Sequence, residues 1–313
     1  MKSSQACREL RRVSKHVNRW LRAQPNVGEE SLTDWMLYSL SSRLPWVKYR
    51  KFTRYQESHQ SGADWEWWFV SQNAALGARV QAKKFDPGAD VYPALAYKPR
   101  TGLQIKTLLQ ASARDSLVPL YILYTSLPKP RVLCPLKPKR KTGDGAFVAV
   151  AQQVYDLFVR PGRVKILADS VVQRSNPLSC LMCCPLVASD DPVLGLWKHF
   201  SQYFRAGEYT GVDLLRPAAP AHVMALMGEN EAPPDRERGD IGALVVFDLR
   251  EESAPDRFAA VRTHGWSRDC DPPSNFGVKL SAGWCPARRP SRLQCRQLHG
   301  VTPAADRSRR GSR

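Results

Sequence analysis

The spacing of hydrophobic and polar positions changes several times along the first 124 residues. Some stretches repeat apolar residues every three or four positions, as amphipathic helices do, and others alternate or form short apolar runs, as strands do. The predicted elements in order are helices over residues 5–23 and 31–43, strands over 47–53, 63–70 and 78–85, a helix over 102–115 and a strand over 117–124. A hairpin followed by a helical crossover implies a mixed sheet. We therefore expect an α/β protein with a mixed central sheet flanked by helices.

Beyond residue 125 the pattern predicts a smaller C-terminal α/β extension. Its predicted elements are helices over residues 149–160 and 191–204 and strands over 164–172 and 243–249, with a basic Pro-rich loop over 127–145 and a charged linker over 228–240. The last 63 residues contain only 8 Leu, Ile, Val or Phe, which predicts disorder. The predicted division is a basic N-terminal helix (1–28), a core (29–172), a C-terminal subdomain (173–250) and a disordered basic tail (251–313).

The chain is strongly basic, with 47 Lys and Arg against 29 Asp and Glu and a formal net charge of +18. The excess lies mainly in the N-terminal helix, in residues 126–165 and in the tail. A basic excess favours an anionic partner, and nucleic acid is the first choice. The cluster of Lys137, Lys139, Arg140 and Lys141 can contact phosphates or form a solvated loop, and both interpretations stay open.

No apolar run reaches the roughly 18 residues that a membrane span needs, and basic residues interrupt the N-terminus where a secretory signal is apolar. We therefore expect a cytoplasmic protein with no membrane partner. In that reducing compartment the eight cysteines are expected to be free thiols. Cys180, Cys183 and Cys184 have a spacing that would allow a zinc site with Cys134 or His199, but their apolar neighbours favour buried thiols over zinc.

Four polar side chains are expected on one face of the predicted hairpin. Because strand residues alternate faces, Asp64 and Glu66 share a face of the first strand, and Gln81 and Lys83 share a face of the second. With a turn centred just after Asn73, Asp64 lies opposite Lys83 and Glu66 opposite Gln81, whereas a slip of one residue would separate the two sets. Buried charges are costly unless they are paired or bind a metal, so such a patch indicates a function.

Metal-assisted hydrolysis of a phosphodiester suits this set of side chains. A divalent cation such as Mg²⁺ or Mn²⁺ prefers oxygen ligands, and Asp64, Gln81, Glu66 and the Ala82 carbonyl can supply them. The cation offsets the charge of the phosphate and activates a bound water, and Lys83 can orient that water or stabilise the transition state. Structural roles for Asp64 and for Lys83, as an ion-paired or snorkelling side chain, remain the alternative.

The order of elements, Gly62-Ala63-Asp64 and Gln81-Ala82-Lys83 together resemble the restriction-endonuclease-like PD-(D/E)XK nuclease superfamily. The glutamine at the first position of the second motif is similar to that of Mrr-type members. Gln81 therefore departs from the acidic residue that is usual at this position, and its amide contributes no negative charge to a bound cation. Residues 29–124 also resemble a bacterial family of unknown function, through Ser31-Leu32-Thr33-Asp34-Trp35 and the aromatic stretch over 62–69. That second resemblance implies no activity.

The nuclease resemblance assigns roles by position. It implies that Asp64 binds the metal, that Gln81 and Lys83 form the terminal motif, and that Glu30 is the acidic residue of the first helix, with its neighbour at position 29 as the less favoured choice. It further implies that Gln104 is a polar active-site residue. Glu30 as an ordinary acid at a helix N-terminus and Gln104 as a solvent-facing residue stay open as alternatives.

These features predict a cytoplasmic, Mg²⁺- or Mn²⁺-dependent nuclease that acts on DNA, and the resemblance implies a role in bacterial defence. The alternative is a catalytically degenerate nucleic-acid-binding or interaction module of the same fold. A zinc-stabilised interaction protein is the third hypothesis.

Overall fold

A computed structural model describes the chain over residues 2–52, 62–96, 103–128, 130–133, 143–158, 167–184, 189–204, 214–229 and 241–250. The chain divides into two units, Met1–Pro255 and Asp256–Arg313, and all of the described residues belong to the first. The predicted disordered tail (251–313) therefore lies outside the described residues.

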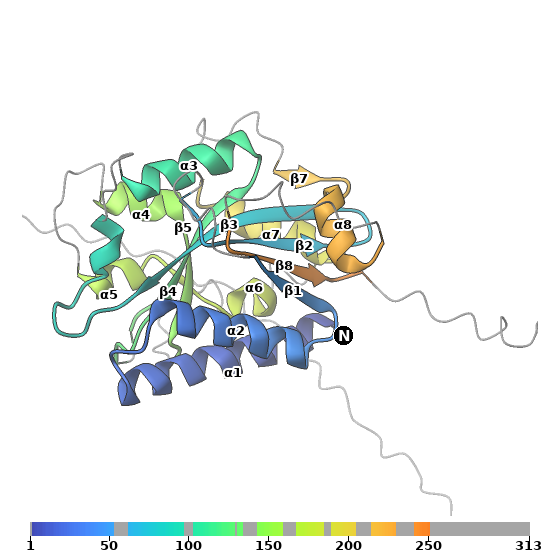
Figure 1. The fold of residues 1–313 in the computed structure, drawn as a ribbon. Helices are drawn as coiled ribbons and strands as arrows, with labels where there is room; N and C mark the ends of the chain where they lie inside the picture. Colours follow the sequence, from blue (N-terminus) through green and yellow to red (C-terminus); the bar gives the residue numbers. More distant parts are fainter. Residues whose placement is uncertain are drawn as a thin grey trace, which may run out of the picture. The chain divides into compact units, whose positions relative to one another are not determined.

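An eight-stranded mixed sheet forms the centre of the first unit (Figure 1). Its strands are β1 (Val47–Lys51), β2 (Trp65–Val70), β3 (Ala75–Lys84), β4 (Val118–Tyr124), β5 (Ala146–Val150), β6 (Asn176–Pro177), β7 (Leu215–Arg216) and β8 (Ala243–Asp248). The order across the sheet is β1-β8-β2-β3-β4-β5-β6, and β7 pairs with the start of β3. The β2–β8 and β3–β4 pairs are parallel and the others antiparallel. The predicted mixed α/β sheet is confirmed.

Helices flank this sheet on both faces (Figure 1). The pair α1 and α2 lies against one face, and α3 and α4 lie on the opposite side. The helices are α1 (Lys2–Ala23), α2 (Glu29–Arg43), α3 (Gln104–Arg114), α4 (Ala151–Phe158), α5 (Ala168–Val172), α6 (Cys180–Cys183), α7 (Pro192–Ser201) and α8 (Ala221–Met227), with a 3-10 turn, η2, at Pro93–Ala96. In the part of the chain that is described, no helix is long and apolar enough to cross a membrane.

The helix α1 is part of the core of this unit. Its apolar stripe, which includes Leu10, Val13 and Val17, is fully buried in the same cluster as Trp65 and Trp67 of β2. Burial of each such side chain contributes roughly 1.5–3 kcal/mol. The basic residues of α1 are exposed or partly exposed, so the helix packs through one face and presents its charges on the other.

The structure corrects three predictions about the elements. Residues 168–172 form a helix, α5, where a strand is predicted, because their buried positions follow helical spacing. β5 goes unpredicted because it is buried along its whole length and so lacks alternation. β8, assigned by sequence to a separate C-terminal subdomain, lies between β1 and β2. The described residues between 173 and 250 therefore contribute β6, β7 and β8 to the central sheet and belong to the same unit as the rest of it.

A disulfide joins Cys7 of α1 to Cys183 of α6, across 176 positions of sequence. Cys180 and Cys184, at the two ends of the same short segment, are buried and are not part of a disulfide. The expectation of free thiols is thus wrong for Cys7 and Cys183. The sequence could not show the pairing, because it depends on α1 and α6 packing together. Cys134 lies outside the described residues.

Reduction of this disulfide should lower the stability of the protein. Closing so long a loop restricts the unfolded chain, and a native disulfide typically contributes about 2–4 kcal/mol. Urea unfolding with and without dithiothreitol measures the loss. The Cys7→Ser variant is the control, because its unfolding midpoint should already be lowered and should not respond to reductant. A wild-type midpoint that is insensitive to reductant would contradict the disulfide.

Candidate active site

A pocket of about 420 Å³ lies where the first residues of α2 and α3 meet the ends of β2 and β3. The residues predicted from the sequence that line it are Glu30, Asp64, Gln81, Lys83 and Gln104. Glu29, the less favoured acidic residue, lines it as well. The structure therefore brings together every predicted catalytic residue, although they come from four separate segments of the chain. The one predicted ligand that does not line this pocket is Glu66.

The register of the hairpin differs from the expected one by two residues. Trp65 pairs with Val80 and Glu66 with Arg79. The difference arises at the turn, where the amide of Ser71 donates to the carbonyl of Ala74 (2.8 Å) and closes a tighter loop than expected. A two-residue change preserves which side chains share a face. Asp64 and Gln81 consequently remain on one face and come into direct contact.

A chain of hydrogen bonds links Asp64 to the start of α3. Both the side-chain amide of Gln81 (2.6 Å) and the backbone amide of Ala82 (2.7 Å) donate to the same oxygen, Oδ2 of Asp64. The Oε1 atom of Gln81 then accepts a hydrogen bond from Nε2 of Gln104 (2.7 Å). Within the part of the chain that is described, the buried Oε1 atom of Gln104 has no hydrogen-bond partner. Gln104 is thus part of the site and not a solvent-facing residue.

Gly62 allows the segment before β2 to approach α3 this closely. Its φ is +67°, and a side chain on it would stand 2.8 Å from the backbone nitrogen of Leu108 and 2.9 Å from the carbonyl oxygen of Gln104. Only glycine tolerates both the conformation and the close backbone contact. The glycine of the Gly62-Ala63-Asp64 motif therefore places Asp64 beside the first turn of α3.

Glu29 is tied to the site by its carboxylate, which accepts a hydrogen bond from the backbone amide of Lys84 (2.6 Å). Burial raises the pKa of Glu29 to about 7, with the charge of Lys83 opposing the shift and that of Asp64 adding to it. Glu30 also lines the pocket but is exposed. The resemblance favours Glu30, whereas the contacts favour Glu29 as the helical acid of the site.

The raised pKa of Glu29 predicts a pH-dependent stability. Since the folded protein binds this proton more tightly than the unfolded chain, stability from this group is greatest below about pH 4.5 and falls as the pH rises towards about 7. The loss should be about 1–2 kcal/mol once partial exposure is considered. Urea unfolding from pH 4 to pH 8 measures it. Glu29→Gln should flatten the dependence and Glu30→Gln should not; an equal response of both variants would contradict the assignment.

Lys83 and the pocket mouth complete the site. Lys83 is only 4% exposed, and its positive charge interacts with the carboxyl group of Glu29. At the mouth, Lys51 forms an ion pair with Asp34, and both line the pocket. Lys51 and Asp34 are not among the site residues predicted from the sequence. Asp34 stands four residues after Glu30, so the helical spacing already placed it on the same side of α2.

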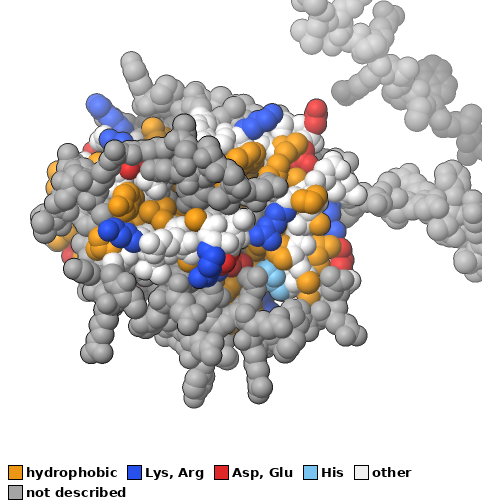
Figure 2. Space-filling view, turned by 90° about the horizontal axis from the view of Figure 1, so that it is seen from above, with side chains coloured by type: hydrophobic (Ala, Val, Ile, Leu, Met, Phe, Trp, Pro, Cys, Tyr) orange, Lys and Arg blue, Asp and Glu red, His pale blue; other side chains and the backbone are white. Residues whose placement is uncertain are grey.

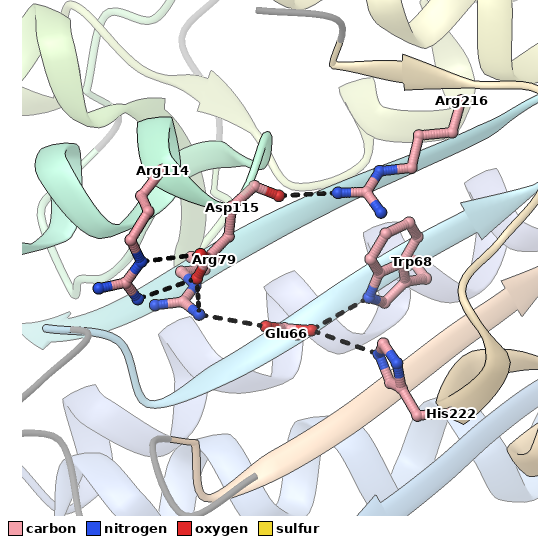
Figure 3. Close-up of polar contacts among 7 residues, drawn as sticks. All are labelled: Glu66, Trp68, Arg79, Arg114, Asp115, Arg216 and His222. Carbon is pink, nitrogen blue, oxygen red and sulfur yellow. Dashed lines mark hydrogen bonds and ion pairs between the residues drawn. The ribbon is translucent and has the colours of Figure 1, made fainter. Parts of the chain in front are cut away.

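Glu66 belongs to a different cluster, drawn in Figure 3. Its carboxylate, 1% exposed, lies 3.7 Å from Arg79 and accepts a hydrogen bond from the indole of Trp68 (3.1 Å). His222 of α8 stands 3.8 Å from it. Arg79 also pairs with Asp115, at the end of α3. Glu66 is predicted as a metal ligand, but in this register it faces Arg79 and does not line the pocket with Asp64.

The structure describes the cysteines proposed for a zinc site, but it does not describe the basic cluster of the predicted loop. Cys183 is held in the disulfide, so Cys180, Cys183 and Cys184 do not form a zinc set. Burial lowers the pKa of His199 to about 4 and keeps it neutral. The cluster of Lys137, Lys139, Arg140 and Lys141 lies outside the described residues. On the face seen in Figure 2, the described basic side chains are scattered among apolar and neutral ones.

The residues of the pocket fit a hard divalent cation through oxygen ligands. Four carboxylates line it (Glu29, Glu30, Asp34 and Asp64) against the two ammonium groups of Lys51 and Lys83. Among the described residues, no three Asp, Glu, His or Cys side chains are grouped closely enough to hold a metal by themselves. A cation here would therefore depend on Asp64 together with neutral oxygens and water, a donor set that Mg²⁺ accepts.

These features define a mixed α/β protein with an open eight-stranded sheet and an acidic pocket at the ends of its β2–β3 hairpin. A family of unknown function, DUF6615, matches residues 6–262, and the chain belongs to that family. No curated protein and no solved structure matches the chain.

Proposed function

We propose that this protein is a Mg²⁺- or Mn²⁺-dependent hydrolase of DNA phosphodiester bonds. The observation that carries the proposal is the convergence of Asp64, Gln81, Lys83 and Gln104 with Glu29 in one pocket. These residues are polar or charged, and Gln81 and Lys83 are almost fully buried. Such a grouping is costly for the fold. A catalytic role would explain why the fold keeps this costly group of side chains. The resemblance of the two hairpin motifs to those of nucleases supports the same assignment.

The chain's own residues would divide the work as follows. Asp64 would hold the cation with its carboxylate, and Gln81 and the Ala82 carbonyl would add neutral oxygens. The cation, when bound, supplies Lewis-acid activation of water and offsets the charge of the phosphate. Lys83 stabilises negative charge that develops on the phosphate. Glu29, with its pKa of about 7, can exchange a proton near neutral pH.

The charge of the pocket supports dependence on a cation. With four carboxylates against two ammonium groups, the pocket repels a phosphodiester in the absence of a counter-ion. The net charge of +18 over the whole chain favours DNA, a polyanion, as the partner. Basic residues outside the pocket would supply the attraction to its phosphates. A nucleic acid thus approaches through the basic parts of the chain and enters the pocket only with the metal.

We propose the cytoplasm as the site of action, where foreign or cellular DNA is accessible. The disulfide between Cys7 and Cys183 argues in the other direction, because such bonds are rare in that compartment. Trapping of free thiols with a maleimide reagent in intact cells, followed by electrophoresis, decides the matter. A fully reduced Cys7 supports the cytoplasm, whereas a quantitative disulfide contradicts it.

Incubation of the full chain with supercoiled plasmid and with linear DNA tests the activity. Cleavage is expected with Mg²⁺ or Mn²⁺, and none with excess EDTA. Ca²⁺ should allow binding with little cleavage if the cation must activate water. Absence of cleavage with every one of these metals, at low and at moderate salt, would overturn the proposal.

One observation favours a second function, that of a degenerate DNA-binding module. Two donors, from Gln81 and Ala82, already satisfy one oxygen of Asp64 without a metal. A site that has lost its reaction can keep such a bond for stability. This alternative predicts salt-dependent DNA binding in a gel-shift assay, with equal binding in EDTA and in Mg²⁺ and with no cleavage.

A further inference from the structure

The side-chain amides of Gln81 and Gln104 are joined by a hydrogen bond, and Gln81 in turn donates to Asp64. We call this pair of amides the relay. The NH₂ group of Gln81 lies 2.6 Å from Oδ2 of Asp64 and 3.3 Å from the carbonyl oxygen of Ala82. Its oxygen accepts a hydrogen bond from Gln104 (2.7 Å), whose own buried oxygen has no partner among the described residues. The NH₂ group of Gln81 therefore sits between two oxygens, and its orientation is coupled to that of Gln104.

Rotating both amides by half a turn preserves their mutual hydrogen bond. The NH₂ group of Gln81 would then donate to the oxygen of Gln104, the atom that now lacks a partner. The unpartnered atom of Gln104 becomes its nitrogen instead of its oxygen, so the relay itself is nearly balanced. The difference between the two arrangements lies at the Asp64 end, where an oxygen of Gln81 replaces an NH₂ group.

The rotated arrangement suits a cation and the observed one suits its absence. With the oxygen of Gln81 turned inward, oxygens from Asp64, Gln81 and Ala82 surround the same position. Three oxygens repel one another without a positive charge, and they are the ligands that a hard divalent cation prefers. A cation therefore decides which arrangement is populated, because it binds only one of them.

We propose that Gln104 is a positioning residue that sets the orientation of the Gln81 amide, so that both amides rotate together when a divalent cation binds beside Asp64. This inference rests on the proposed function, since it assumes a cation at that site. It explains how a glutamine can replace the usual acidic residue. Gln104 makes the oxygen of Gln81 available by offering an acceptor to its NH₂ group.

The test measures Mn²⁺ affinity by electron paramagnetic resonance in a double-mutant cycle. Gln104→Glu offers only an acceptor, so it should hold Gln81 in the cation-binding orientation and tighten Mn²⁺ binding roughly tenfold, about the effect of one hydrogen bond. The added negative charge also attracts Mn²⁺. The same substitution in a Gln81→Met background isolates that charge effect, because the relay is absent there, and a gain below threefold is expected.

Each outcome decides one point. A gain that is clearly larger with Gln81 present supports the relay, and equal gains in both backgrounds overturn it while leaving the cation site intact. If wild-type protein binds no Mn²⁺ at millimolar concentration, the proposed function fails together with the inference. If Gln104→Glu fails to fold, Gln104→Lys replaces it in the test, because lysine offers only donors. Gln104→Lys should weaken Mn²⁺ binding more when Gln81 is present than in the Gln81→Met background. An equal loss of Mn²⁺ affinity in both backgrounds would contradict the relay.

A second readout does not depend on affinity. In side-chain ¹H–¹⁵N spectra, Mg²⁺ should shift the NH₂ signals of both Gln81 and Gln104 in the wild-type protein. In Gln104→Glu, the Gln81 signal should already lie near its Mg²⁺-bound position before Mg²⁺ is added. A purely structural Gln104 would leave the Gln81 signal at its cation-free position in the variant, and that result would overturn the proposal.

Discussion

Asp64→Ala should reduce Mg²⁺-dependent DNA cleavage by at least about 10³-fold in kcat/KM, which corresponds to roughly 4 kcal/mol of transition-state stabilisation. The carboxylate of Asp64 accepts hydrogen bonds from both Gln81 and Ala82. Its removal takes away the one charged ligand at the centre of the proposed site, and neutral oxygens alone hold a divalent cation poorly. Initial rates of plasmid nicking, measured over a range of DNA concentrations, provide the comparison.

The pocket itself offers a matched control for this variant. Asp34 lines the same pocket and carries the same charge, but it pairs with Lys51 at the mouth. Asp34→Asn should therefore retain cleavage within about threefold, since one exposed ion pair contributes little. Equal losses in Asp64→Ala and Asp34→Asn would mean that the charge of the pocket matters and the position of Asp64 does not. Undiminished cleavage by Asp64→Ala would exclude the site.

Arg79→Met should lower the free energy of unfolding by about 3–5 kcal/mol, because it leaves Glu66 as a buried charge without its cation. Arg79 contacts both Glu66 (3.7 Å) and Asp115 (2.5 Å) from the middle of β3, and its side chain is 4% exposed (Figure 3). Methionine has a similar length and no charge, so packing changes little. Urea unfolding monitored by tryptophan fluorescence measures the loss.

Two further variants separate charge from packing in this cluster. Arg114→Met removes a neighbouring arginine that also contacts Asp115 but is 65% exposed, and it should cost less than about 1 kcal/mol. Combining Arg79→Met with Glu66→Gln should recover most of the loss, because no buried charge then remains unpaired. If Arg79→Met is as mild as Arg114→Met, Glu66 does not depend on Arg79 to compensate its buried charge.

The sequence predicted which polar side chains meet in one pocket better than it predicted the order of the strands around them. Alternation along two strands was enough to put Asp64, Gln81 and Lys83 on one face, because strand parity survives a two-residue error in register. The same parity rule could not exclude Glu66. Its actual partner, Arg79, depends on where the turn closes, and the turn closes through a local bond at Ser71 that the pattern does not reveal.

Long-range pairing accounts for the other differences. β8 enters the sheet between β1 and β2, about 180 positions after β2 in sequence, and no local pattern encodes such an insertion. The disulfide from Cys7 to Cys183 likewise depends on two helices meeting in space. The sequence also could not show which of Glu29 and Glu30 belongs to the site, because neighbouring helical residues differ only in the direction of their side chains. The hydrogen bond from the backbone amide of Lys84 distinguishes Glu29.

The most direct test of the cation site is an anomalous difference map from crystals grown with Mn²⁺. We expect one strong peak within about 2.0–2.4 Å of a carboxylate oxygen of Asp64 and of the side-chain oxygen of Gln81. An Mn²⁺ peak elsewhere in the crystal, with no peak beside Asp64, would contradict the assignment of this pocket as a divalent-cation site for phosphodiester hydrolysis.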